Sequence, residues 1–422
     1  MNIRISFYCL IGLFMLGACS APTQTDSSAD EAIDSSGDAG PVVIEAGSFL
    51  DSSKEVDATE SGVYFDEDGW LSYDVTVPEA GRFMVSVSAS AAEEGASVWL
   101  EDYIDNTDGR TYNVTGSIAI PANGVVASSS VDGTPLNAGL HKMKVHVGAG
   151  VTLGKVTLSM IKAKVETPTT MTQNLEGDEW VVAWADEFDG ETIDTEKWTY
   201  DLGNWGWGNN ELQYYTVENT DNARIEDGYL VIEARKNETG DGWTSARLTT
   251  REKVSFLYGK IEFKAKVPRE RGNWAAGWTL GDTYVDEKSW PYCGEIDIME
   301  SVGYEVNDET GDGIAHVTVH TPAYYFKIGN QISNTKDIVD IADEFHTYGV
   351  EWTPTEVKGF VDGEEYYLYD KTANELEWPF NIPQNIILNL AMGGGWGGAK
   401  GMDPNITSQK LIIDYVRVYE KG

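Results

Sequence analysis

Three acidic residues recur within one short apolar segment of the chain. In the run GEIDIME, residues 294–300, Glu295 and Asp297 alternate with isoleucines, so in a β-strand they share one face. Glu300 reaches that face only if a β-bulge around Ile298-Met299 absorbs one extra residue. With this bulge the two glutamate Cα atoms lie ~13 Å apart, at about 3.3 Å per residue. Inward-leaning side chains then bring the carboxyl groups to about 5 to 6 Å, the separation of a retaining glycosidase pair.

Three acids on one face repel one another, which requires either usefully raised pKa values or a bound cation. In the first case Glu295 is the ionised nucleophile, Glu300 is the protonated acid that later acts as base, and Asp297 modulates the charge on Glu295. A hard-cation site and a solvated strand edge are the alternatives. Sugar rings stack on aromatic planes, so tryptophans just upstream favour the glycosidase interpretation. They are Trp274, Trp278 and Trp290.

The elements that position these residues are predicted to be β-strands. Short runs such as Trp70–Val77 and Lys260–Val267 alternate apolar and polar residues, and no segment has a sustained helical period. Residues 41–165 are therefore predicted to form a small antiparallel β-sandwich, and residues 175–422 a large two-sheet sandwich, with a linker at 166–174. Twelve of the fourteen tryptophans lie in the second sandwich, where we expect the sugar contacts.

The N-terminus carries signals for export. Residues 1–18 contain an apolar run that follows Arg4 and is too short to span a bilayer, which is typical of a signal peptide. The run ends in LGAC, which resembles the bacterial lipoprotein box and implies cleavage before Cys19 and lipidation of its thiol. Residues 19–40 contain no aromatic residue and are predicted to form an acidic flexible tether. We expect an exported bacterial lipoprotein, held at the outer membrane or cell surface by this anchor.

Composition and charge exclude several classes of protein. Hydrophobic residues make up 41% of the 422 residues and charged residues 23%, which excludes a collagen, a coiled coil and an entirely disordered chain. The formal net charge of −39 disfavours nucleic acid and anionic membrane surfaces as partners, so a neutral or cationic partner is expected. After lipidation of Cys19, Cys293 is the remaining thiol of the mature chain, which excludes an intrachain disulfide.

The second sandwich resembles glycoside hydrolase family 16, and more closely its laminarinase-like members. The resemblance rests on the signature E-x-D-x-x-E, matched by Glu295, Asp297 and Glu300, and on an ordered series of flanking segments. These are WADEFDG (184–190), WGNNELQYY (207–215), SARLTT (245–250), YGKIE (258–262), VDG (361–363) and DYVRVY (414–419). The family implies an all-β fold, a concave two-sheet β-jelly roll that carries the signature on a bulged strand.

The same resemblance implies a set of residues that contact the sugar. His320 is expected near the leaving-group side of the cleft. Residues 274–280 read WAAGWTL and depart from the family's more usual Trp-Pro-Ala-aromatic-Trp-Met-Leu run, so the cleft wall is expected to differ there. A metal pair of His316 and His320 lacks a third ligand. The other implied sugar-binding residues are Asn209, Arg247, Trp274, Trp278 and Trp290.

The resemblance implies no cofactor for catalysis but a structural Ca²⁺ on the convex side, held by Glu187, the carbonyl of Gly228 and Asp414. Oxygen ligands from distant strands would tie the two ends of the domain together.

Residues 41–165 resemble carbohydrate-binding module family 6. The shared segments are VIEA (43–46), DGWLSY (68–73), PEAG (78–81) and GLHK (139–142). The end of the module departs from that family, because LGKVTL (153–158) stands where such modules carry an Asn-Leu-Asp-Trp-like segment that contacts ligand. Sugar binding and a spacer role therefore both remain open.

Together these features predict a monomeric, endo-acting β-1,3-glucanase that cleaves laminarin-type glucan with retention of configuration, with Glu295 as nucleophile and Glu300 as acid/base. The bulged spacing favours β-1,3-glucans, because lichenase-type family members have one residue fewer. The alternatives are the same chemistry on mixed-linkage β-glucan or a marine galactan, and a non-catalytic glucan-binding protein on the same fold. A receptor without activity has no use for both glutamates, which favours the enzyme.

Overall fold

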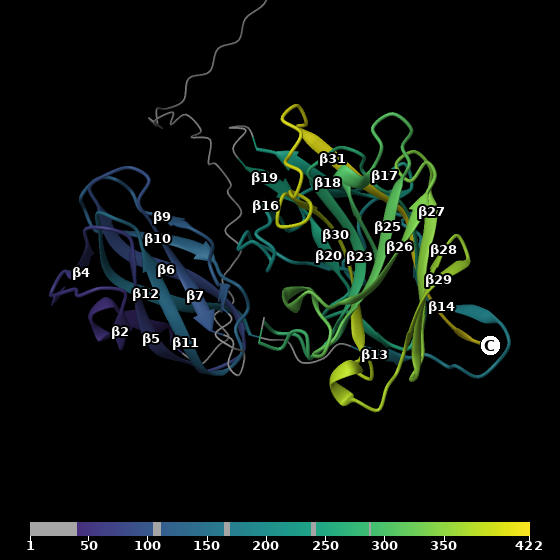
Figure 1. Ribbon diagram of the computed structural model, residues 1–422, viewed down its shortest axis with the longest axis horizontal. Helices are drawn as coiled ribbons and strands as arrows, with labels where there is room; N and C mark the ends of the chain where they lie inside the picture. Colours follow the sequence, from purple (N-terminus) through teal and green to yellow (C-terminus); the bar gives the residue numbers. More distant parts are fainter. Residues whose placement is uncertain (1–39, 104–110, 164–168, 238–241, 287) are drawn as a thin grey trace, which may run out of the picture. The chain divides into compact units, whose positions relative to one another are not determined.

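The computed structural model describes residues 40–103, 111–163, 169–237, 242–286 and 288–422. These residues fold almost entirely into β-strands, which confirms the predicted all-β class. The strands form two sandwiches, each with its own buried hydrophobic core (Figure 1). The short 3-10 helices between them are η1 (Ala46–Ser48), η2 (Gly303–Glu305), η3 (Phe326–Ile328) and η4 (Glu375–Glu377).

The signal peptide, Cys19 and all but the last residue of the predicted tether lie outside the described residues, as do residues 166–168 of the predicted linker. Within the described ranges, no helix has the length and apolar character needed to cross a membrane.

The first sandwich consists of two six-stranded antiparallel sheets. Alternate residues of its strands are buried, as in β6 (Gly81–Ala91), where Phe83, Val85 and Val87 point into the core. One sheet contains β10 (Ala127–Asp132), β6 (Gly81–Ala91), β12 (Val151–Ala163), β4 (Gly62–Phe65), β3 (Ala58–Thr59) and β1 (Val42–Glu45). The other contains β2 (Asp51–Ser52), β5 (Gly69–Val77), β11 (Gly139–Val147), β7 (Ser97–Tyr103), β8 (Thr111–Asn113) and β9 (Ile118–Ala119).

The second sandwich is larger, with a nine-stranded and a ten-stranded sheet (Figure 1, teal to yellow). The nine-stranded sheet runs in the order β13 (Thr169–Thr172), β21 (Val254–Leu257), β30 (Gln384–Met392), β23 (Asn273–Gly281), β24 (Glu295–Val302), β25 (Gly313–His320) and β26 (Ile332–Ile338), with β20 (Arg247–Thr249) on β30 and β15 (Thr199–Tyr200) on β20. The ten-stranded sheet runs β16 (Gln213–Tyr215), β19 (Trp243–Ser245), β18 (Tyr229–Lys236), β31 (Ser408–Lys421), β22 (Gly259–Lys266), β27 (His346–Trp352), β28 (Glu356–Val361) and β29 (Glu364–Asp370), with β14 (Trp180–Asp186) on β31 and β17 (Ala223–Glu226) on β18.

Close packing between these two sheets depends on a glycine in β23. An added Cβ at Gly277 would lie 2.2 Å from the ring of Phe263 on β22, a distance that no side chain tolerates. The missing side chain lets the aromatic ring of one sheet rest directly on the backbone of the other. This contact supports β23 immediately beside the acidic strand β24.

One predicted boundary differs in the structure. Thr169–Thr172, expected to belong to the linker, form β13 and pair in parallel with β21. The pairing gives the backbone amides of an otherwise polar segment hydrogen-bond partners at the edge of the nine-stranded sheet, which the composition of the segment does not reveal.

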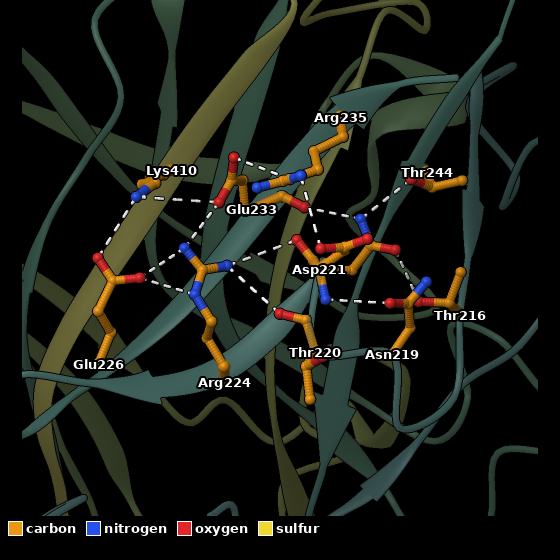
Figure 2. Close-up of polar contacts among 11 residues, drawn as sticks. Thr216, Asn219, Thr220, Asp221, Arg224, Glu226, Glu233, Arg235, Thr244 and Lys410 are labelled. Carbon is orange, nitrogen blue, oxygen red and sulfur yellow. Dashed lines mark hydrogen bonds and ion pairs between the residues drawn. The ribbon is translucent and has the colours of Figure 1, made fainter. Parts of the chain in front are cut away.

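A polar network around the buried Glu233 joins β17, β18 and β31 (Figure 2). The Glu233 side chain is 3% exposed and accepts hydrogen bonds from Arg224 Nη2 (2.8 Å) and Arg235 Nε (3.0 Å). Burial acts to raise the pKa of Glu233, but the bonds from the two guanidinium groups outweigh it and hold that pKa below its usual value. Lys410 Nζ lies 3.9 Å from Glu233 Oε2, and the buried Asn222 donates from Nδ2 to the backbone carbonyl oxygen of Glu233 (2.9 Å).

Candidate active site

The acidic strand β24 contains the bulge that the sequence predicts. Glu295 and Asp297 pair with His320 and Thr318 of β25, but the next pair joins Glu300 to His316. From Asp297 to Glu300 the strand β24 therefore takes three residue steps, where β25 takes two from Thr318 to His316. The bulge returns Glu300 to the face that carries Glu295 and Asp297.

The three acids line a cavity of about 640 Å³ on the nine-stranded sheet. Across this sheet, one residue from each of five neighbouring strands stands in register along the cavity, from β20 to β25. Four strand spacings of about 4.8 Å make this row ~19 Å long. The row consists of Arg247, Asn389, Ala276, Glu300 and His316. All six residues that the sequence predicts to contact sugar also line the cavity.

Two of the predicted tryptophans hold the two glutamates. The indole N–H of Trp290 donates to Glu295 Oε2 (2.8 Å), and the indole N–H of Trp274 donates to Glu300 Oε1 (3.0 Å). Each bond occupies one carboxyl oxygen and fixes the orientation of the group. The sequence indicated these tryptophans only as stacking surfaces, because the partner of an indole N–H depends on strand register.

A third tryptophan helps to hold Arg247. The guanidinium carbon of Arg247 lies 4.7 Å from the ring centroids of both Trp207 and Trp278, so the cation is enclosed between two aromatic faces. Its Nε lies 2.9 Å from Asp201 Oδ2. The indole N–H of Trp278 donates to Asn389 Oδ1 (2.7 Å), which anchors one of the two rings.

Each of the two histidines of β25 lies next to a different glutamate. His320 Nε2 lies 3.3 Å from Asp297 Oδ2 and 3.7 Å from Glu295 Oε1, so it lies beside these two acids. His316 stands opposite Glu300 and bonds to Glu305 Oε2 through Nε2 (2.6 Å). His316 therefore lies beside Glu300, and His320 lies beside Glu295 and Asp297; the expected place of His320 near the leaving-group side stays a prediction. The strand register sets this division.

Burial dominates the electrostatics of the three acids. It raises the pKa of Glu295 to about 8, with the charge of Asp297 acting in the same direction. Burial likewise raises the pKa of Asp297 to about 8 and that of Glu300 well above its usual value. The three carboxyl groups therefore cannot all be ionised at neutral pH. Nearby His320 and the Trp290 N–H favour the ionised form of Glu295, whereas the charges of Asp297 and Glu295 act with burial to raise the pKa of Glu300.

Sequence reasoning missed further residues that line the cavity. Glu211 accepts hydrogen bonds from Asn209 Nδ2 (3.1 Å) and Gln213 Nε2 (2.7 Å), and burial raises its pKa. Trp207 and Glu211 lie in the segment WGNNELQYY, which matches the family. Of this segment the sequence predicted only Asn209 as a sugar-binding residue. The cavity lining also includes Trp396, from the glycine-rich segment 393–398.

The predicted calcium ligands are paired with cations of the chain. Both carboxylate oxygens of Glu187 accept from Arg417, at 2.8 and 2.7 Å, and Asp414 Oδ2 accepts from Lys264 Nζ (2.8 Å). Gly228 lies in the turn between β17 and β18, with φ +82°. A calcium ion at Glu187 would compete with Arg417 for the carboxylate, and the calcium site stays a prediction.

Comparison with known proteins agrees with this geometry. The family model for glycosyl hydrolases family 16 matches residues 209–417. A beta-glucanase of Rhodothermus marinus is 46% identical over 249 residues, which cover 57% of this chain and 85% of the relative. A glucan endo-1,3-beta-glucosidase of Cryptopygus antarcticus is 37% identical over 240 residues, covering 54% and 85%.

The X-ray structure of the laminarinase from Rhodothermus marinus superposes with a TM-score of 0.53 at 44% sequence identity, over 57% of this chain and 98% of that one. The family model covers only residues of the second sandwich, so the resemblance of the first sandwich to a carbohydrate-binding module stays a prediction. The jelly-roll sandwich, the acid-lined cavity and these relatives lead to one conclusion: the chain belongs to glycosyl hydrolase family 16 and is a glycoside hydrolase.

Proposed function

We propose that this enzyme is a retaining, endo-acting hydrolase of β-1,3-glucan, with Glu295 as nucleophile and Glu300 as acid/base. The observation that carries the proposal is the bulge in β24, which places both glutamates on the cavity face with Asp297 between them. The names of the two relatives, a beta-glucanase and a glucan endo-1,3-beta-glucosidase, support a glucan as the substrate.

The proposed reaction is a double displacement. Protonated Glu300 donates its proton to the glycosidic oxygen while a carboxylate oxygen of Glu295 attacks the anomeric carbon, so the glycosidic bond breaks and a glycosyl-enzyme forms. Glu300, now ionised, then takes a proton from the water that attacks the same carbon and releases Glu295. Asp297 modulates the charge on Glu295 throughout, because its charge raises the pKa of Glu295.

The length of the residue row supports endo action on a polymer. Its ~19 Å extent, from four strand spacings, accommodates several sugar rings, and three of the four spacings lie on the Arg247 side of Glu300. A reducing-sugar assay over laminarin, curdlan, lichenan, agarose and carrageenan tests the substrate. Preference for lichenan would favour the mixed-linkage alternative, and preference for agarose or carrageenan the galactan alternative. Loss of laminarin hydrolysis in EDTA would favour the hard-cation alternative, for which Glu295, Asp297 and His320 offer ligand atoms within 4.8 Å of one another.

The catalytic roles are tested by Glu295→Gln and Glu300→Gln. Both variants should lose laminarin hydrolysis, but only Glu300→Gln should still be glycosylated by a substrate with an activated aryl leaving group, because such a group needs no acid. Azide should then restore turnover of Glu300→Gln and give a β-glycosyl azide. Azide rescue of Glu295→Gln alone would exchange the two roles, and an α-configured product from the wild-type enzyme would contradict retention.

A further inference from the structure

The glycine-rich segment Gly393–Gly398 carries Trp396 and is held in place by backbone hydrogen bonds. Backbone bonds fix it at two points, from Gly393 N to Gly272 O (2.8 Å) and from Gly395 N to Asn209 O (2.7 Å). A Cβ at Gly397 would lie 2.8 Å from Gly393 O and 3.0 Å from the Cβ of Trp274, so the tight loop requires glycine there. Trp396, within this loop, lines the cavity beside the acids.

Trp396 contacts two side chains next to Glu300: Trp274, which donates to its carboxyl group, and His316, its register partner on β25. Its ring meets Trp274 of β23 at 5.2 Å and 69°, and His316 of β25 at 4.8 Å and 86°. Both are edge-to-face contacts, the arrangement that aromatic pairs favour. Glu300 lies on β24, the strand between them, and Trp274 is the residue that donates to Glu300 Oε1. Trp396 therefore packs against the donor that orients the acid.

We propose that Trp396 is a positioning residue for the general acid: by packing against Trp274 and His316, it fixes the indole whose N–H occupies Glu300 Oε1. With Oε1 occupied as an acceptor, the proton of the acid resides on Oε2, the oxygen left to deliver it to the glycosidic oxygen. An indole free to rotate would lose this bond, and the carboxyl group could then present either oxygen. The inference rests on the proposed role of Glu300 as acid/base.

The test compares two substrates whose dependence on the acid differs. Laminarin has a poor leaving group and needs proton transfer, whereas a dinitrophenyl β-laminaribioside does not. Trp396→Ala should slow laminarin hydrolysis about 10- to 100-fold, since small misplacements of a catalytic group cost rates of that order. Glycosylation by the activated substrate should fall less than about threefold, because the acid contributes little to it. Trp274→Phe, which keeps a ring but removes the N–H, should show the same pattern.

The double variant Trp274→Phe/Trp396→Ala tests whether Trp396 acts through the hydrogen bond from Trp274 to Glu300. If both residues act through the one hydrogen bond to Glu300, the double variant should be no slower than Trp274→Phe alone. Two results would overturn the proposal. In the first, the rate losses of the two single variants multiply in the double variant. In the second, Trp396→Ala loses equal activity on both substrates, mainly through a higher KM, which would make Trp396 a sugar-binding residue.

Two references complete the experiment. Phe345→Ala removes a half-buried aromatic residue that stacks on Tyr229, and should lower the melting temperature without changing the ratio of the two activities. Trp396→Phe keeps an aromatic ring in the loop and should retain more laminarin activity than Trp396→Ala, which keeps the proposal testable if the alanine variant folds poorly. If Glu300→Gln itself shows no dependence on the leaving group, the proposed role of Glu300 fails first.

Discussion

Burial of three carboxyl groups on β24 gives the site its chemistry at the expense of stability. The pKa of Glu295 rises from 4.5 to about 8 on folding, so the folded enzyme binds this proton more tightly than the unfolded chain does. Stability is therefore lost as the pH rises from about 4.5 towards 8, because the unfolded chain ionises freely in that range.

We expect Glu295→Gln to raise the stability of the second sandwich at pH 7 by on the order of 2 kcal/mol. The amide oxygen of the glutamine can still accept the hydrogen bond from Trp290. An amide does not ionise, so the cost of keeping a carboxyl group protonated in the folded state disappears. The advantage should vanish below about pH 4.5, where the wild-type group is protonated in both states. Tryptophan-fluorescence melts between pH 4 and 8 measure it.

The control for this prediction has the opposite sign. Arg224 holds the pKa of Glu226 below its usual value, so Glu226→Gln should lose a little stability as the pH rises and gain none. A gain for Glu295→Gln that does not depend on pH would show that burial of the charge is not its cause.

At the scale of elements, ion pairs join strands of the ten-stranded sheet. The Glu233 network joins β17, β18 and β31, and Glu187 with Arg417 joins the end of β14 to the same strand β31. We still propose a structural calcium at Glu187, Gly228 and Asp414. In this proposal the ion and Arg417 compete for the Glu187 carboxylate.

Calcium binding should therefore become stronger when Arg417 is removed. We expect Ca²⁺ to raise the melting temperature of Arg417→Gln more than that of the wild-type enzyme, and EDTA to reverse the effect, because binding to the folded state alone stabilises it. Arg224→Gln, which leaves Glu187 untouched, is the matched control. Melting curves that ignore calcium in both the wild type and Arg417→Gln would contradict the proposal.

At the scale of the whole molecule, the predicted lipid anchor is a proposal that concerns residues outside the described part of the chain. A net charge of −39 offers no attraction to an anionic membrane, so attachment should depend on the lipidated Cys19 alone. Cys19→Ala should move the enzyme from the membrane pellet to the soluble fraction with its activity on laminarin unchanged. Cys293→Ala, which replaces a buried cysteine of the second sandwich, should stay with the membrane. Sedimentation of Cys19→Ala with membranes would contradict the lipoprotein prediction.

The sequence by itself determined the features that depend on local order along the chain. Alternation of apolar and polar residues predicted the strands, because side chains of a strand point to opposite faces in turn. The count of residues between Glu295 and Glu300 predicted the bulge, and the ordered motifs predicted the family. The structure and the relatives confirm the all-β fold, the bulge and the glycoside hydrolase.

Only the tertiary structure decided which side chains meet across strands and loops. The bonds of Trp274 and Trp290 to the two glutamates and the place of His316 opposite Glu300 follow from register. The approach of Trp396 follows from a loop more than ninety residues away in sequence from Glu300. Register and loop packing are set by the burial of the whole sandwich, and no short segment of the sequence records which partner it will meet.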